Sequence, residues 1–223
     1  MPAPLLYDGI MRRRIHRAPQ SGLLRLFWET LRGREHILVR PAPELPLVTI
    51  AFPRGERTGA MELKAALEET WLTIPADLRA RYAPVLEKMP PMVVVDLRSR
   101  NTCRCLGHFH PTGTESRLTR RLRALSGVDA CEMDLAFTAI KEWQPSPLAY
   151  NAASHAAGLE RGPEFELFRL RLALLDVFLH ELHHRASPEA EEREVRGHSG
   201  DFYSAALDAF VQDHFGVGYG LSS

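Results

Sequence analysis

The stretch PEFELFRLRLALLDVFLHELHHRAS, residues 163–187, predicts a long helix. A proline stands at its first position, glutamates follow in the first turn, and Pro188 lies just beyond its end, as is usual for helices. A helix that is apolar nearly all round is expected to be buried. The apolar positions here are Leu167, Leu170, Leu174, Leu175, Val177, Phe178 and Leu182.

The last turns of this helix carry His180, Glu181 and His184, which is the H-E-x-x-H pattern. Side chains four residues apart lie one above the other on a helix, so both imidazoles can reach one ion at about 2.0–2.1 Å. Glu181 can take a proton from water that the metal has acidified. At this composition the pattern is expected by chance about 0.04 times. The sequence therefore predicts a metal site, with a solvated, charged helix end as the alternative.

A catalytic zinc site needs a third protein ligand. Two common arrangements would place a histidine at position 190 or a glutamate near position 204, but the chain has Ala190 and Ser204. We expect His198 instead, at the start of the last predicted helix, because the thirteen-residue connection from His184 is long enough to double back. His183 points about 100° away from His184 and is expected at the surface or in contact with a ligand.

The connection between His184 and His198 is acidic. We expect its acids to be solvated, with Glu194 as the substitute ligand. They are Glu189, Glu191, Glu192 and Glu194.

The order HELHH (residues 180–184), an acidic connection and GHSGDFY (residues 197–203) resembles the SprT-like zinc metallopeptidase family, which includes the Spartan proteases. The resemblance covers residues 59–215, and its specific motifs cover residues 178–203. It implies one zinc ion held by His180, His184 and His198, with Glu181 as general base.

The fold class predicted for the chain is α+β, with a small antiparallel or mixed sheet packed against helices and H-E-x-x-H on a buried helix, as in SprT-like zincins. Helix is expected over residues 59–88 with a break near Pro75, and strands over 92–99, 102–111 and 131–140. Residues 114–127 fit a hairpin or a short helix. A long loop is expected over 143–163 and a final amphipathic helix over 200–215.

Two domains are predicted, a basic N-terminal extension at residues 1–57 and the SprT-like metallopeptidase domain at 58–223. The extension contains a helical pattern near residues 22–32. Its segments 36–41 and 45–53 fit short strands stopped by proline.

A second cluster of possible ligands comprises Cys103, Cys105, His108 and His110. On a strand the two cysteines share one face and the two histidines the other, and eight residues do not easily wrap an ion. We expect the cysteines to pack inward and one of the histidines to lie near the active-site cleft. A second metal at this cluster is the alternative.

Charge and composition limit the classes of partner. The formal net charge is zero, but two segments are rich in arginine, which suits phosphate. Solvated faces are one interpretation of these segments and a nucleic-acid surface is the other. The candidate contacts are Arg12, Arg13, Arg14, Arg117, Arg120, Arg121 and Arg123.

The location predicted for the chain is cytoplasmic. No apolar run is long enough to span a membrane, the N-terminus has the wrong order of charges for a secretory signal, and three cysteines are too few for a disulfide framework. We therefore expect a protein without membrane contact.

The function expected from these features is a zinc-dependent endopeptidase that acts on a protein or peptide substrate, with nucleic-acid-associated proteins, including proteins bound to DNA, among the candidates. We expect Tyr203, Tyr150 or His155 to stabilise the oxyanion of the transition state. One alternative is a non-catalytic protein in which zinc staples the last two helices. Another is a nucleic-acid accessory protein that uses its arginines.

Overall fold

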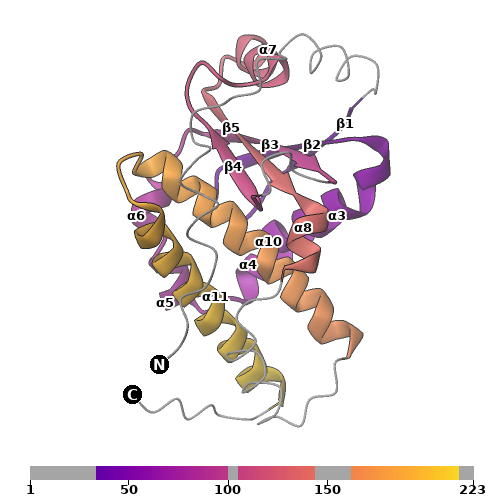
Figure 1. Cartoon of the computed structure of the whole chain (residues 1–223), viewed down its shortest axis with the longest axis vertical. Coiled ribbons are helices and arrows are strands. Elements are labelled where there is room, and N and C mark those ends of the chain that lie inside the picture. The colour runs from indigo at the N-terminus through magenta and orange to yellow at the C-terminus, as the bar shows by residue number, and fades with distance from the viewer. Residues whose placement is uncertain (1–33, 100–104, 144–161, 216–223) are drawn as a thin grey trace.

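The computed structural model describes residues 34–99, 105–143 and 162–215 (Figure 1). Five strands in these ranges form one mixed sheet in the order β1-β2-β3-β5-β4. β2, β3 and β5 run parallel, whereas β1 pairs antiparallel with β2 and β4 pairs antiparallel with β5. The α+β prediction is confirmed to this extent. The strands are β1 (Glu35–Val39), β2 (Leu47–Phe52), β3 (Met92–Arg98), β4 (Gly107–His110) and β5 (Ala130–Ala136).

Helices occupy the connections and the C-terminal part. The predicted break near Pro75 is confirmed, because Ile74 leaves the helical conformation with ψ 133° and Pro75 precedes the next helix. The helical elements are η1 (Arg54–Glu56), α3 (Arg57–Ala65), the π-helical turn η2 (Ala66–Thr70), α4 (Trp71–Thr73), α5 (Ala76–Ala80), α6 (Ala83–Leu86), α7 (Arg117–Ser126), α8 (Phe137–Glu142), α10 (Pro163–Ala186) and α11 (Glu192–Phe215).

The helices cover the two faces of the sheet unequally (Figure 1). One face packs against α3 and α10, and η2 and α11 pack on α10 in the same main core, which includes Trp71, Phe178 and Phe202. The other face carries a small apolar cluster around Met92 and Val94, which α7 covers. The sheet therefore separates α7 from the helix that carries the H-E-x-x-H pattern.

Helix α10 is buried over most of its length, as its composition predicts. Leu174, Leu175, Phe178 and Leu182 have no exposed surface. Leu167 is the exception at 38% exposed, because the first turns of α10 extend beyond the sheet (Figure 1). The core thus fixes the C-terminal half of the helix, where the candidate ligands lie.

The domain boundary predicted at residue 57 needs correction. Strands β1 and β2 both precede it, yet β2 pairs along its length with β3 of the same sheet. β2 is almost entirely buried, since it has a strand on each side and α3 packed against it. Residues 35–52 therefore belong to the same domain as the candidate site. The helical pattern near residues 22–32 lies outside the described residues.

Three further local predictions are resolved by the structure. Residues 114–127 contain the helix α7, which Gly127 ends in a left-handed conformation with φ 67°. The strand predicted over 131–140 is wrong after Ala136, where helix α8 begins. The last helix begins at Glu192, eight residues earlier than predicted. The predicted loop at 143–163 falls almost wholly outside the described residues.

None of the helices in the described ranges is long and apolar enough to cross a lipid bilayer.

Candidate metal centre

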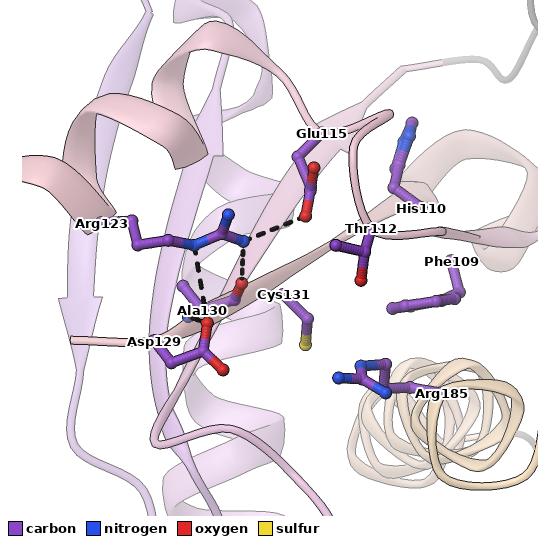
Figure 2. A pocket seen from close by; sticks show the side chains of 9 residues that line it. All are labelled: Phe109, His110, Thr112, Glu115, Arg123, Asp129, Ala130, Cys131 and Arg185. Atoms are coloured by element: carbon purple, nitrogen blue, oxygen red, sulfur yellow. Dashed lines mark hydrogen bonds and ion pairs between the residues drawn. The ribbon is translucent and has the colours of Figure 1, made fainter.

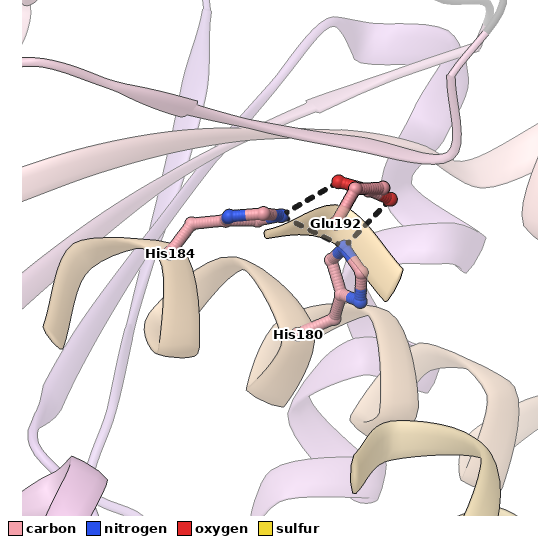
Figure 3. A group of neighbouring side chains, drawn as sticks. All are labelled: His180, His184 and Glu192. Atoms are coloured by element: carbon pink, nitrogen blue, oxygen red, sulfur yellow. Dashed lines mark hydrogen bonds and ion pairs between the residues drawn. The ribbon is translucent and has the colours of Figure 1, made fainter. Parts of the chain in front are cut away.

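The side chains of His180, His184 and Glu192 converge where the end of α10 meets the start of α11 (Figure 3). The Nε2 atoms of the two histidines are 3.0 Å apart. One carboxylate oxygen of Glu192 lies 3.1 Å from Nε2 of His184, and the other lies 3.5 Å from Nε2 of His180. The four-residue spacing on α10 therefore does bring two imidazole nitrogens to one point.

Glu192 reaches this point because the connection between the two helices is short. α10 ends at Ala186 and α11 begins at Glu192, so α11 turns back with its first residue opposite the last turns of α10. The carboxylate of Glu192 also accepts a hydrogen bond of 2.9 Å from Nε of Arg196, one turn further along α11. The expectation that all four acids of the connection are solvated is therefore wrong for Glu192.

Electrostatics couple Glu192 to the histidines. Hydrogen bonds from His180 and His184 hold the pKa of the Glu192 carboxyl well below its usual range. The hydrogen bond to Glu192 in turn raises the pKa of His184, against the opposing effect of its burial. The low pKa favours the charged form of the Glu192 carboxyl, which lies between the two imidazoles.

Glu181 lies beneath the edge strand β4. It is 6% exposed, and burial raises the pKa of its carboxyl. The backbone N–H of Phe109 in β4 donates a hydrogen bond to this carboxylate. Gly107 makes the close approach possible, because a Cβ at that position would lie 2.5 Å from Oε1 of Glu181. β4 therefore fixes the carboxylate beside the histidines.

His198 does not join the group of ligand atoms in this structure. Its ring lies 5.2 Å from the ring of His183, and the side of α11 that faces His180 is occupied by its neighbour Ser199. The early start of α11 is the reason, since it puts Glu192, and not His198, at the helix terminus opposite His184. Burial lowers the pKa of His183, and the nearby His198 lowers it further.

A second layer of contacts supports His180. Oγ of Ser199 lies 3.5 Å from Nδ1 of His180, and Ser199 also hydrogen-bonds Asp176, which lies one turn before His180 on the same side of α10. Asp176 is 6% exposed, and burial raises its pKa to about 8. A hydroxyl or carboxylate at the outer nitrogen of a metal-binding imidazole typically fixes the orientation of the ring.

The donor set of this centre fits zinc. Two imidazole nitrogens and one carboxylate oxygen lie within 4.8 Å of one another, and catalytic zinc sites use such a set together with one open position. No family model, curated protein or solved structure matches this chain. Its function is therefore argued from the site itself.

The structure describes one of the three residues predicted to stabilise the transition state. Tyr203 is 3% exposed, and its ring packs edge-on against Trp143 at 5.4 Å. Tyr203 follows Ser199, the residue that faces His180, by one turn of α11. Tyr150 and His155 fall outside the described residues.

The second ligand cluster is divided by the structure. Cys103 is outside the described residues and Cys105 is half-buried. The histidines share one side of β4, with ring centroids 5.1 Å apart. Burial lowers the pKa of His108, and His110 and more weakly His184 act in the same direction. Neither histidine of β4 is among the ligand atoms that converge on His180 and His184 in the described residues.

His110 instead joins two acids of β5, Glu132 and Asp134, with ligand atoms within 4.8 Å of one another. Nε2 of His110 lies 3.1 Å from Asp134, which also pairs with Arg98. Glu132 accepts hydrogen bonds of 2.6 Å from the Ser116 backbone and the Thr119 hydroxyl. Because both carboxylates already bind donors of the protein, we assign them a structural role in the sheet.

The arginines predicted to contact nucleic acid fall into three groups. Arg117, Arg120 and Arg121 are exposed on α7. Arg123 turns inward, donating to Glu115 and to the backbone carbonyl of Ala130. Arg12, Arg13 and Arg14 lie outside the described residues.

Proposed function

We propose that this protein is a zinc-dependent endopeptidase. The observation that carries the proposal is the meeting of the His180 and His184 nitrogens at 3.0 Å with a buried carboxylate, Glu181, on the same helix. The likeness of HELHH and GHSGDFY to SprT-like zinc metallopeptidases supports the same class. We infer that His180, His184 and one residue of α11 hold one zinc ion.

Two residues of α11 qualify as the third ligand, on different grounds. Glu192 contacts both imidazoles. His198 is implied by the family resemblance and lies next to Ser199, whose hydroxyl faces His180. Because both belong to α11, either ligand would tie the last two helices together.

Zinc at this centre would polarise the scissile carbonyl and acidify the attacking water. Glu181 then accepts the proton of that water and passes it to the leaving amine. The Phe109 N–H and the close packing of Gly107 hold this carboxylate in position, so it loses little freedom in the reaction. We assign no oxyanion role to Tyr203, whose ring packs against Trp143.

A peptide substrate is favoured by the position of β4. This strand is at the end of the sheet order, so one side of its backbone has no partner strand in the described sheet. An extended peptide can add to such an edge through main-chain hydrogen bonds to the backbone groups other than the Phe109 N–H, which is bonded to Glu181. The added chain would pass over Glu181, which lies beneath that edge.

The test is the variant Glu181→Gln, with zinc content and cleavage of an unfolded protein measured in parallel. We expect zinc to be retained and cleavage to fall at least a hundredfold, since removal of a general base typically costs about 10²–10⁴. Glu189→Gln is the matched control, because Glu189 is exposed in the connection and should leave cleavage unchanged. Cleavage by Glu181→Gln at the wild-type rate would refute the mechanism.

The same experiment separates the peptidase from a non-catalytic zinc protein. If wild-type protein binds zinc and loses stability under chelation, but cleaves neither an unfolded protein nor a DNA-bound one, the zinc ion has a structural role and no catalytic one. Stability is read from thermal unfolding with and without chelator.

A nucleic-acid contact is a second candidate function, favoured by the three exposed arginines of α7. Neutralising phosphate would make binding salt-dependent. We expect the triple variant Arg117→Glu, Arg120→Glu, Arg121→Glu to lose DNA binding in a fluorescence anisotropy titration at low salt. Retention of wild-type binding by this variant would exclude α7 as the contact. α7 lies on the opposite side of the sheet from α10 (Figure 1), so peptidase activity on a free peptide should not change.

A further inference from the structure

A small, partly open cavity lies between β4, β5, the loop before α7 and the end of α10 (Figure 2). Its volume is about 120 Å³, and Phe109, Thr112, Cys131 and Arg185 are among the residues that line it. Drug-sized ligands occupy pockets of about 300–1,000 Å³. This cavity, which we call the Arg185 pocket, therefore suits a single side chain.

The Arg185 pocket offers one uncommitted positive charge. Figure 2 shows the guanidinium of Arg185 extending from the end of α10 into the cavity, toward Cys131. No hydrogen bond or ion pair joins it to another residue in the described ranges. The acids of the lining are engaged elsewhere, since Arg123 donates to Glu115 over 3.0 Å and lies 3.6 Å from Asp129.

The pocket is one helical turn from Glu181. Arg185 follows Glu181 by four residues, so the two side chains lie on the same side of α10, about 6 Å apart along its axis. Phe109 connects them, because its N–H binds the Glu181 carboxylate and its ring lines the pocket. An extended peptide advances about 3.3 Å per residue, so two residues of substrate span the same distance.

We propose that the Arg185 pocket binds an acidic side chain of the substrate, about two residues from the bond that is cut. This inference rests on the proposed peptidase function and names its preferred sequence. The guanidinium can donate two parallel hydrogen bonds to a carboxylate. The Phe109 ring gives apolar contact to the methylenes that precede it. An uncharged or basic side chain would leave Arg185 without a partner.

The cleavage test uses the zinc-loaded full-length protein and a peptide library in which each position holds Asp, Glu, Gln or Lys. We expect wild type to prefer an acid about tenfold to a hundredfold over glutamine at one position within two or three residues of the cut, the range for a hydrogen-bonded charge. Arg185→Glu should lose this preference and favour lysine there. Arg193→Glu, an exposed change on α11, is the control for general charge effects.

A binding test makes the inference independent of turnover. Glu181→Gln protein is titrated with two peptides that differ only by glutamate or glutamine at the preferred position, or at each position in turn if nothing is cut. We expect tighter binding of the glutamate peptide, lost when Arg185→Glu is added.

The two hypotheses fail in different ways. Cleavage with no preference for acids, or with the preference unchanged in Arg185→Glu, overturns the pocket assignment and leaves the peptidase intact. Absence of cleavage by zinc-loaded protein overturns the peptidase, and the binding test then decides the pocket alone. Equal binding of the two peptides, or no binding of either, overturns the pocket assignment.

Discussion

Replacing Gly107 with alanine tests the coupling between the edge strand and the proposed general base. A Cβ at this position would lie 2.5 Å from Oε1, 2.7 Å from Cγ and 2.9 Å from Cδ of Glu181. Ordinary van der Waals contact begins at 3.4 Å, so the glutamate or the strand must move by about 1 Å. Cγ belongs to the stem of the side chain, which a rotation of the carboxylate alone does not move.

The expected cost has two parts. Overpacking a buried site costs about 1–3 kcal/mol of stability. A displacement of about 1 Å in a catalytic group can cost about a hundredfold in rate. Gly197→Ala is the matched control, because nothing lies within 4 Å of a Cβ there. Gly197 lies within α11, so alanine should stabilise the protein by about 0.5–1 kcal/mol.

The assay is urea unfolding of four proteins: wild type, Gly107→Ala, Glu181→Ala and the double variant. If the clash is with Glu181, truncating that side chain should remove most of the cost of the alanine, giving a coupling of about 1–3 kcal/mol. The cleavage rate of Gly107→Ala is measured beside them. A coupling near zero, or a Gly107→Ala protein as stable and active as wild type, would refute the proposed contact between β4 and the base.

Two further predictions concern the same end of the molecule. Asp176 has its pKa raised to about 8, so in the folded zinc-free protein this carboxyl keeps a proton that it releases near pH 4 in the unfolded chain. The contribution of this one group should lower the stability by about 1.4 kcal/mol per pH unit between these values and change no further above them. Asp176→Asn should lack this slope in urea unfolding, and parallel slopes for the two proteins would contradict the assignment. Glu192→Gln and His198→Gln, compared by zinc titration against a chelator, should identify the third ligand by a loss of affinity beyond the roughly 10–100-fold typical of outer contacts. If neither variant loses affinity, neither Glu192 nor His198 is the third ligand.

Local signals in the sequence predicted much of the fold. Helix α10, the strand β3 and the break at Pro75 follow from short-range patterns of apolar residues and prolines. The pairing of β2 with β3 does not follow from such short-range patterns, because strands about 40 residues apart in the sequence leave no local signal of their pairing. The boundary drawn at residue 57 failed for that reason.

The candidate site also contains residues that local patterns predict and residues that they do not. His180, Glu181 and His184 are close in the sequence, so helix geometry alone predicts that they meet. Glu192 was missed because its acidic neighbourhood also fits a solvated connector. The signal that could have found it is the run of acids that opens the last helix, because acids are favoured in the first turn and Glu192 and Glu194 stand there. The Arg185 pocket depends on tertiary packing and has no sequence pattern.

The pairing of β2 with β3 has a practical consequence for any shortened form of this protein. A fragment starting at residue 58 would retain every candidate ligand but lack β1 and β2. The backbone of β3 would then lose its partner along residues 92–96, and its run of valines would face solvent beside open hydrogen-bonding groups. Exposed apolar edges of this kind pair with other chains. Such a fragment should aggregate, and its inactivity would say nothing about the chemistry of the histidines.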